Sequence, residues 1–234
     1  MNEDKRTLKF GFYTAISLIV MTIITWILAM KAVPASGPYC PGDCMDYPFE
    51  DLILYYPRDY YWMYLAVFQV FAYFIFIISN HFTTQNENKL FSFLSIAFAV
   101  ITATVLLIVY FVQFSVVPIS VMNGETDGIA LLTQYNDHGI FIAMEELGYI
   151  TMSISFLFLA FIFTNKTRLE KSLRIILILG FIFTVFSFVF YSVNFGIDRS
   201  YRFEVAAISI NWITTITTGI LVSIFMRKRL KKIK

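Results

Sequence analysis

Long apolar stretches separated by short polar segments set the pattern of this sequence. Six of the stretches carry at most two charged residues each, and all are long enough to form a membrane-spanning helix. A helix rises 1.5 Å per residue, so about 20 apolar residues cross the roughly 30 Å hydrocarbon core of a bilayer. The apolar residues are continuous and lack the alternating polarity of a membrane barrel. The pattern predicts an all-α polytopic bundle of six transmembrane helices, over residues 10–30, 60–80, 90–117, 139–164, 173–195 and 205–226.

Basic residues are concentrated in alternate polar segments, and this sets the expected orientation. The segment before the first stretch carries three, residues 165–174 carry four and residues 227–234 carry six, whereas residues 118–138 carry none. Lys and Arg mark the cytoplasmic side of a membrane protein. We therefore expect both termini in the cytoplasm, with extracytoplasmic loops at residues 31–59, 118–138 and 196–204.

Composition agrees with this architecture and excludes several classes of protein. Hydrophobic residues make up 58% of the 234 residues and charged residues only 15%, whereas about a quarter of a soluble domain is charged. We expect one domain over residues 1–234, embedded in the lipid bilayer of the cell membrane. The basic tail next to the last stretch is typical of contact with anionic lipids, not of nucleic-acid binding. No phosphate-binding or other cofactor motif is present, so no cofactor is predicted, and the oligomeric state is left open.

Two adjacent carboxylates, Glu145 and Glu146, interrupt the fourth stretch. A charge at mid-bilayer costs about 2.5–3.5 kcal/mol on insertion scales, so such residues are candidates for function. If the helix begins near Leu147, both glutamates lie at the outer interface, where the helix dipole favours them. If it begins at Gly139, both lie inside the bundle. The sequence leaves these two interpretations open.

Helical spacing separates the two glutamates. Steps of three or four residues place Glu145 on one face with His138 and Tyr149, whereas Glu146 shares the adjacent face with small residues. We therefore expect Glu145 to face a polar cavity as the titrating, functional group. Glu146 is expected to serve mainly in packing or capping.

Further charged and aromatic residues open the second and sixth stretches, which enter from the same side as the fourth. Arg58 and Arg202 are candidate partners for Glu145, Glu146 or Glu204. The alternative is that these residues only anchor and cap helices at the interface, where Arg, Tyr and Trp are common. The candidate polar cavity comprises His138, Glu145, Glu146, Tyr149, Arg58, Trp62, Arg202 and Glu204.

The chain has only two cysteines, Cys40 and Cys44, in the first outer loop. The Pro-Gly pair between them favours a type II turn, which would bring the thiols together as a structural disulfide. A redox-active pair is a second possibility, although redox motifs usually have two intervening residues and this pair has three. Metal binding with Asp43 and Asp46 is weaker still because no histidine is adjacent, so no metal site is predicted.

Three functions remain compatible with the sequence. We favour a small carrier or binding protein, with an outer-half cavity for a small cation, a proton-coupled solute or an amphiphile. The first alternative is a membrane enzyme that acts on a lipid-like substrate through a His–Glu acid–base pair. The second alternative is an accessory subunit without chemistry. Because only one of the three functions is enzymatic, the sequence leaves open whether the protein is an enzyme. A water-reachable cavity lined by the carboxylates would favour the first function. A lateral opening to lipid beside a His–Glu contact would favour the enzyme, and the absence of a cavity would favour the accessory subunit.

Overall fold

The computed structural model describes residues 5–32, 34–42 and 44–233, and within these ranges it contains helices but no strand. Six helices are long and apolar enough to cross a membrane. They coincide with the six predicted stretches, although the ends differ by a few residues. The six are α1 (Lys5–Ala29), α2 (Tyr61–Phe82), α3 (Lys89–Ser115), α6 (Ile140–Ala160), α7 (Arg168–Phe195) and α8 (Tyr201–Lys232).

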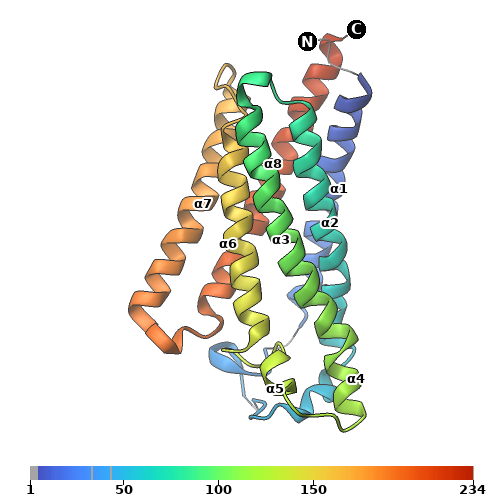
Figure 1. Ribbon diagram of the computed structural model, residues 1–234, viewed down its shortest axis with the longest axis vertical. Coiled ribbons are helices and arrows are strands. Elements are labelled where there is room, and N and C mark those ends of the chain that lie inside the picture. Colours follow the sequence, from blue (N-terminus) through green and yellow to red (C-terminus); the bar gives the residue numbers. More distant parts are fainter. Residues whose placement is uncertain (1–4, 33, 43, 234) are drawn as a thin grey trace.

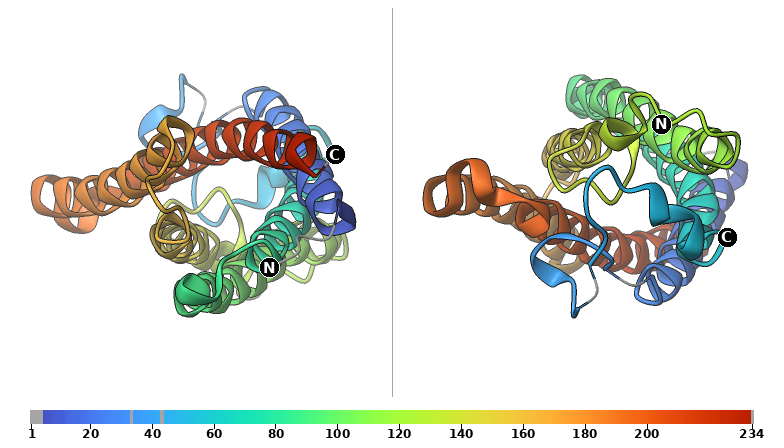
Figure 2. Two further views of the ribbon diagram at one scale, coloured as in Figure 1. Left: turned by 90° about the horizontal axis from the view of Figure 1, so that it is seen from above. Right: turned by 90° about the horizontal axis from the view of Figure 1, so that it is seen from below.

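The six long helices pack in a ring. Helix α1 contacts α2 and α8, and the order continues from α2 through α3, α6 and α7 back to α8. A further contact between α6 and α8 crosses the ring, and the arrangement is visible along the bundle in Figure 2. Both chain ends lie at one end of the bundle, here called the terminal end. The short helices α4 (Val117–Met122) and α5 (Ile129–Leu132) lie at the other end, here called the loop end (Figure 1).

Helices α3 and α6 approach closely because small and hydroxylated residues line their contact. A Cβ atom on Gly148 would lie only 2.4 Å from Cδ2 of Leu106. The hydroxyl groups of Thr102 and Thr151 are 2.9 Å apart. Small residues let helix backbones approach each other, and hydroxyls hydrogen-bond between helices. This contact brings the loop-end part of α3 against α6, where Glu145 lies.

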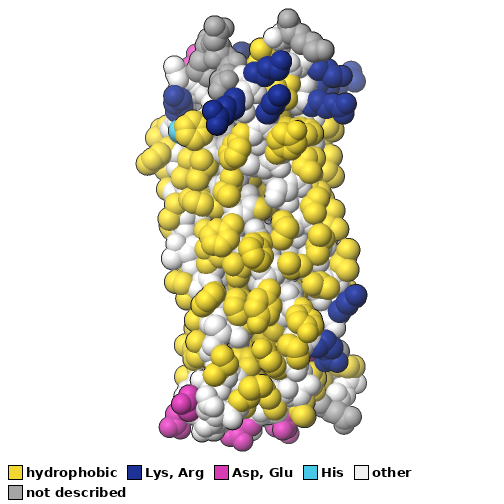
Figure 3. All heavy atoms as spheres, turned by 90° about the vertical axis from the view of Figure 1, so that its right-hand side faces the viewer, with side chains coloured by type: hydrophobic (Ala, Val, Ile, Leu, Met, Phe, Trp, Pro, Cys, Tyr) yellow, Lys and Arg dark blue, Asp and Glu magenta, His cyan; other side chains and the backbone are white. Residues whose placement is uncertain are grey.

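Charge is distributed unevenly between the two ends. On the face in Figure 3, most Lys and Arg side chains gather at the terminal end, and a smaller group lies near the loop end, where the acidic side chains lie. A broad apolar surface separates the two ends. The loop end also carries the disulfide between Cys40 and Cys44, whose Cα atoms are 6.0 Å apart. This agrees with the predicted bridge, and the oxidised sulfurs are not available as metal ligands. Asp43 lies outside the described residues.

Candidate functional site

Three carboxyl groups are buried near the loop end, two from α6 and one from α8. The exposed fraction is 0% for Glu145, 7% for Glu146 and 8% for Glu204. Helix α6 begins at Ile140, so both of its glutamates lie in the second turn, already covered by neighbouring helices. The interfacial interpretation assumed a helix that starts near Leu147, whereas α6 begins at Ile140 and buries both side chains within the bundle.

A chain of hydrogen bonds from α3, α6 and α8 ends on Glu145. The hydroxyl of Tyr110 donates to Oε1 of Glu145 over 2.7 Å. Because that bond uses the only proton of Tyr110, the hydroxyl of Tyr149, 2.9 Å away, must donate to Tyr110. The indole Nε1–H of Trp212 then donates to Tyr149 over 3.1 Å. The three donors therefore form one chain that ends at Oε1 of Glu145.

The other oxygen of Glu145 has a different environment. Its Oε2 atom is buried and has no hydrogen-bond donor among the described residues. The carboxyl group of Glu204 lies within hydrogen-bonding reach of Glu145. Carboxylates only accept hydrogen bonds, so a bond between these two groups requires a proton on one of them. Two neighbouring carboxyl groups that share one proton also occur in aspartic proteases.

Glu146, the next residue on α6, binds Arg199. The guanidinium donates to Oε2 of Glu146, and it also donates to the hydroxyl of Ser192 over 3.1 Å. The aromatic rings of Phe188 and Phe203 lie 5.2 and 5.5 Å from the guanidinium carbon. Arg199 is thus held by a carboxylate, a hydroxyl and two ring faces. The charge of Glu146 is compensated within the protein.

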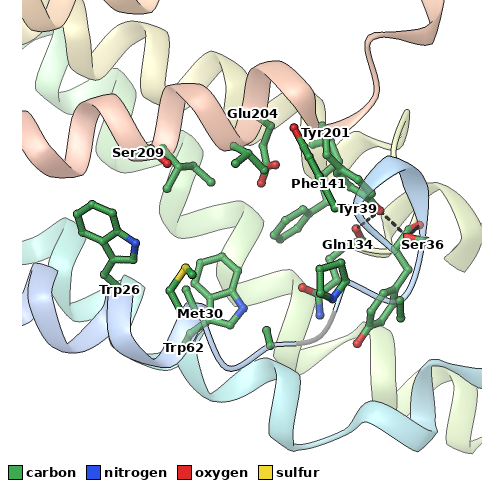
Figure 4. A pocket seen from close by; sticks show the side chains of 18 of the residues that line it. Trp26, Met30, Ser36, Tyr39, Trp62, Gln134, Phe141, Tyr201, Glu204 and Ser209 are labelled. Carbon is green, nitrogen blue, oxygen red and sulfur yellow. Dashed lines mark hydrogen bonds between the residues drawn. The ribbon is translucent and has the colours of Figure 1, made fainter. Parts of the chain in front are cut away.

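A cavity of about 460 Å³ lies beside the carboxyl pair, between α1, α2, α6, α8 and two loop segments. Glu204 points into it from α8 (Figure 4). The chain has three tryptophans, and all three line the cavity. Seven of the 19 lining residues are aromatic, and most of the others are aliphatic. The aromatic lining residues are Trp26, Tyr39, Trp62, Tyr135, Phe141, Tyr201 and Trp212.

The cavity wall is connected to the hydrogen-bond chain at two points. Trp212 both lines the cavity and donates to Tyr149, and its ring packs edge-on against Trp26, with centroids 5.9 Å apart. Trp62 packs in the same way on Tyr110, with centroids 5.4 Å apart. A ligand that moves either indole would therefore disturb the donors that hold Glu145.

Loop residues cover the loop end of the cavity. The hydroxyl of Tyr201 lies 2.7 Å from that of Ser36, and it donates to the carbonyl of Gln134 over 3.0 Å. Burial raises the pKa of Tyr39 and of Tyr135 above the ordinary value, so both phenols are neutral near pH 7. The phenols of Tyr39 and Tyr135 therefore add no charge to the cover.

The cavity opens at the side of the bundle. Two of its lining residues, Met30 and Val205, have exposed fractions of 76% and 43%. Met30 follows the loop-end terminus of α1, and Val205 lies in the second turn of α8. The cavity therefore reaches the surface between the loop-end parts of these two helices.

The structure brings together some of the predicted site residues and separates others. Glu145, Glu146, Tyr149 and Glu204 lie close together, and Trp62 lines the adjoining cavity.

His138 does not join this group. Its side chain is 79% exposed, and its Nδ1 atom lies 2.9 Å from Oδ1 of Asp137. The spacing that predicted a face shared with Glu145 assumed a continuous helix, but α6 begins two residues after His138.

The two predicted arginine partners also lie elsewhere. Arg58 donates to the neighbouring Asp59 over 2.6 Å. Arg202 donates to the carbonyl of Asp198 over 2.9 Å and packs over the ring of Phe195. The glutamate partner is instead Arg199, three residues before Arg202 in the same charged segment.

Three further residues of the site, Tyr110, Trp26 and Trp212, were not predicted from the sequence. Each is a single amphipathic aromatic residue in an apolar stretch, which by itself is typical of packing. The presence of only three tryptophans is the one signal that could have linked two of them to Trp62.

No matching family model, curated protein or solved structure was found for this chain. Within the part of the chain that the structure describes, no three His, Cys, Asp or Glu side chains are grouped as metal ligands would be.

Proposed function

We propose that this protein is a small membrane carrier or binding protein whose ligand is an organic cation with an apolar part. The observation that carries the proposal is the cavity, which has aromatic walls, all three tryptophans and the carboxyl group of Glu204. Aromatic faces attract ammonium groups, and indole rings do so most strongly. A volume of about 460 Å³ suits a small organic molecule.

The proposal includes an orientation in the cell membrane. The six apolar helices span the bilayer, with the basic terminal end in the cytoplasm and the loop end outside. The side opening between α1 and α8 then faces the outer leaflet. An amphiphilic cation would enter from the lipid with its charged group next to Glu204 and its apolar part among the indoles.

The two alternative functions have less support. An enzyme with a His–Glu acid–base pair needs His138 beside a glutamate, but the imidazole is exposed and lies against Asp137. A purely accessory subunit does not need a cavity, and its polar groups would all be caps or helix contacts. The aromatic cavity with one carboxyl group in its wall therefore favours binding or transport.

Intrinsic tryptophan fluorescence tests ligand binding directly, because every tryptophan lines the cavity. Purified protein in phosphatidylcholine vesicles would be titrated with decyltrimethylammonium and, separately, with decyl sulfate of the same chain length. We expect a saturable change with the cation only. In Glu204→Gln the dissociation constant should rise about tenfold or more, which corresponds to about 1.4 kcal/mol.

Glu125→Gln is the matched control, since Glu125 is exposed in a loop away from the cavity. It should bind like the wild type. An equal response to cation and anion, or an unchanged affinity in Glu204→Gln, would contradict the proposal. Uptake of the labelled cation into sealed proteoliposomes would then distinguish a carrier from a binding protein.

A further inference from the structure

We infer that Glu204 exchanges a proton for the organic cation, while Glu145 keeps a second proton that bridges the two carboxyl groups. This inference rests on the proposed function and adds its coupling to protons. It also moves the exchanging group from Glu145, which the sequence pattern favours, to Glu204. The reason is position, because Glu204 lines the cavity and Glu145 has no exposed surface.

The proton on Glu145 follows from its hydrogen-bond geometry. Oε1 accepts from Tyr110 at 2.7 Å, and the buried Oε2 has no donor among the described residues although the Glu204 carboxyl lies within reach. A protonated Glu145 donates from Oε2 to Glu204 and still accepts from Tyr110 at Oε1. Every polar atom of Glu145 then has a partner, as buried polar groups require.

The surrounding charges explain why a second positive charge is needed. From η5 (Gly196–Arg199), Arg199 compensates Glu146. The other titratable groups that face the pair are tyrosines, namely Tyr110 on α3, Tyr149 on α6, Tyr201 on α8 and Tyr39 in the loop. The charge of Arg202 lies near Tyr39. Its guanidinium donates to the carbonyl of Asp198 and packs over the ring of Phe195.

With one shared proton, the Glu145–Glu204 pair carries one uncompensated negative charge in an apolar wall. That charge is costly away from water and is neutralised by a second proton or by a cation.

The exchange step balances in charge and atoms. Without ligand, Glu204 is a carboxylic acid that accepts from Glu145 and directs its own O–H into the cavity. When the cation enters, this O–H bond breaks and the proton leaves through the cavity to bulk water. The Glu204 carboxylate then faces the cation and still accepts from Glu145. One positive charge enters and one leaves, so the buried site is neutral in both states.

Proton release on ligand binding tests the inference. Decyltrimethylammonium is a suitable probe because it has no N–H, so any released proton comes from the protein. It would be added to the protein in a weakly buffered solution with a pH-indicator dye. We expect up to one proton per bound cation. The affinity should strengthen by up to tenfold for each pH unit of increase while Glu204 is protonated, because linkage between two ligands is reciprocal.

Two variants separate the roles of the carboxyl groups. Glu145→Gln resembles a protonated Glu145, since its amide can still donate to Glu204, so cation binding with proton release should persist. Glu204→Gln should lose proton release, and Glu125→Gln should behave like the wild type.

The outcomes are distinct. Binding with no proton release and no pH dependence in the wild type would overturn the exchange and leave the proposed function intact. Loss of release in Glu145→Gln, with binding retained, would assign the exchange to Glu145 instead. Absence of cation binding would overturn both proposals. If Glu204→Gln fails to fold, the wild-type titration alone decides.

Discussion

Replacing Arg199 by Met removes the charge that compensates the buried Glu146. The methionine keeps an apolar side chain over Phe188 and Phe203, so the change mainly deletes the guanidinium. Glu146 is then left 7% exposed without its cation. We expect this variant to be clearly less stable than the wild type.

The expected cost follows from the burial of the two partners. Removing one partner of a fully buried ion pair costs about 3–5 kcal/mol. The Arg199 side chain is 26% exposed, so water partly solvates the vacated site, and we expect about 2–3 kcal/mol. Glu146→Gln should cost only about 1 kcal/mol, because its amide oxygen still accepts from Arg199 and the guanidinium keeps Ser192 and both rings. The double variant should therefore cost about 1–2 kcal/mol less than the sum of the single changes.

The free energy of unfolding would be measured by titration with sodium dodecyl sulfate in mixed micelles, followed by circular dichroism. Arg202→Met is the matched control, because it removes the same charge from the same end of the bundle. Among the described residues, its guanidinium donates only to a carbonyl and stacks on a ring, so the cost should stay below about 1 kcal/mol. Equal losses for Arg199→Met and Arg202→Met, or strict additivity in the cycle with Glu146→Gln, would refute this reasoning.

Three other predictions concern packing, the disulfide and topology. Gly148→Ala should destabilise the protein by about 1–3 kcal/mol in the same unfolding assay, because the new Cβ would overlap buried Leu106. The control Gly11→Ala should be neutral or stabilising, because its Cβ meets only the flexible end of a methionine. Equal effects of the two substitutions would contradict the close α3–α6 contact. Replacing both cysteines by Ser should make the outer loop more susceptible to proteolysis. The free energy of unfolding should fall by less than about 2 kcal/mol, because the disulfide closes only a short ring. A larger loss would show that the loop holds the bundle together. The described cysteines are both bridged, so a single added cysteine would be the thiol that is labelled. In intact cells, a cysteine at Asp127 should react with an impermeant maleimide and a cysteine at Lys166 should not. The reverse pattern would overturn the proposed orientation.

Much of the architecture follows from local patterns in the sequence. Each long helix is encoded by one continuous apolar stretch, so its existence can be predicted without knowledge of its neighbours. The disulfide is similarly local, because its two cysteines are only four residues apart. The different environments of Glu145 and Glu146 also follow from helical spacing, since adjacent residues project about 100° apart.

The partners across the bundle were decided by tertiary structure. His138 was expected beside Glu145, but the start of α6 at Ile140 removed it from the helical spacing. Arg199, and not Arg58 or Arg202, reached Glu146, because the turn before α8 carries it over Phe188 and Phe203. Which residue pairs with a buried glutamate therefore depends on the course of the loops and on the aromatic rings that pack against the charged side chain.

The cavity is the clearest case of a feature that only the folded chain contains. Its three tryptophans lie on α1, α2 and α8, and they are far apart in the sequence. Likewise, Glu145 and Glu204 are 59 positions apart by their residue numbers, and their contact requires the crossing of α6 and α8. Hydrophobic patterning determines that each helix forms, because that depends on nearby residues and the surrounding lipid. The order of helices around the ring determines which polar groups meet, because these groups find hydrogen-bond partners only across the helix contacts that the ring creates.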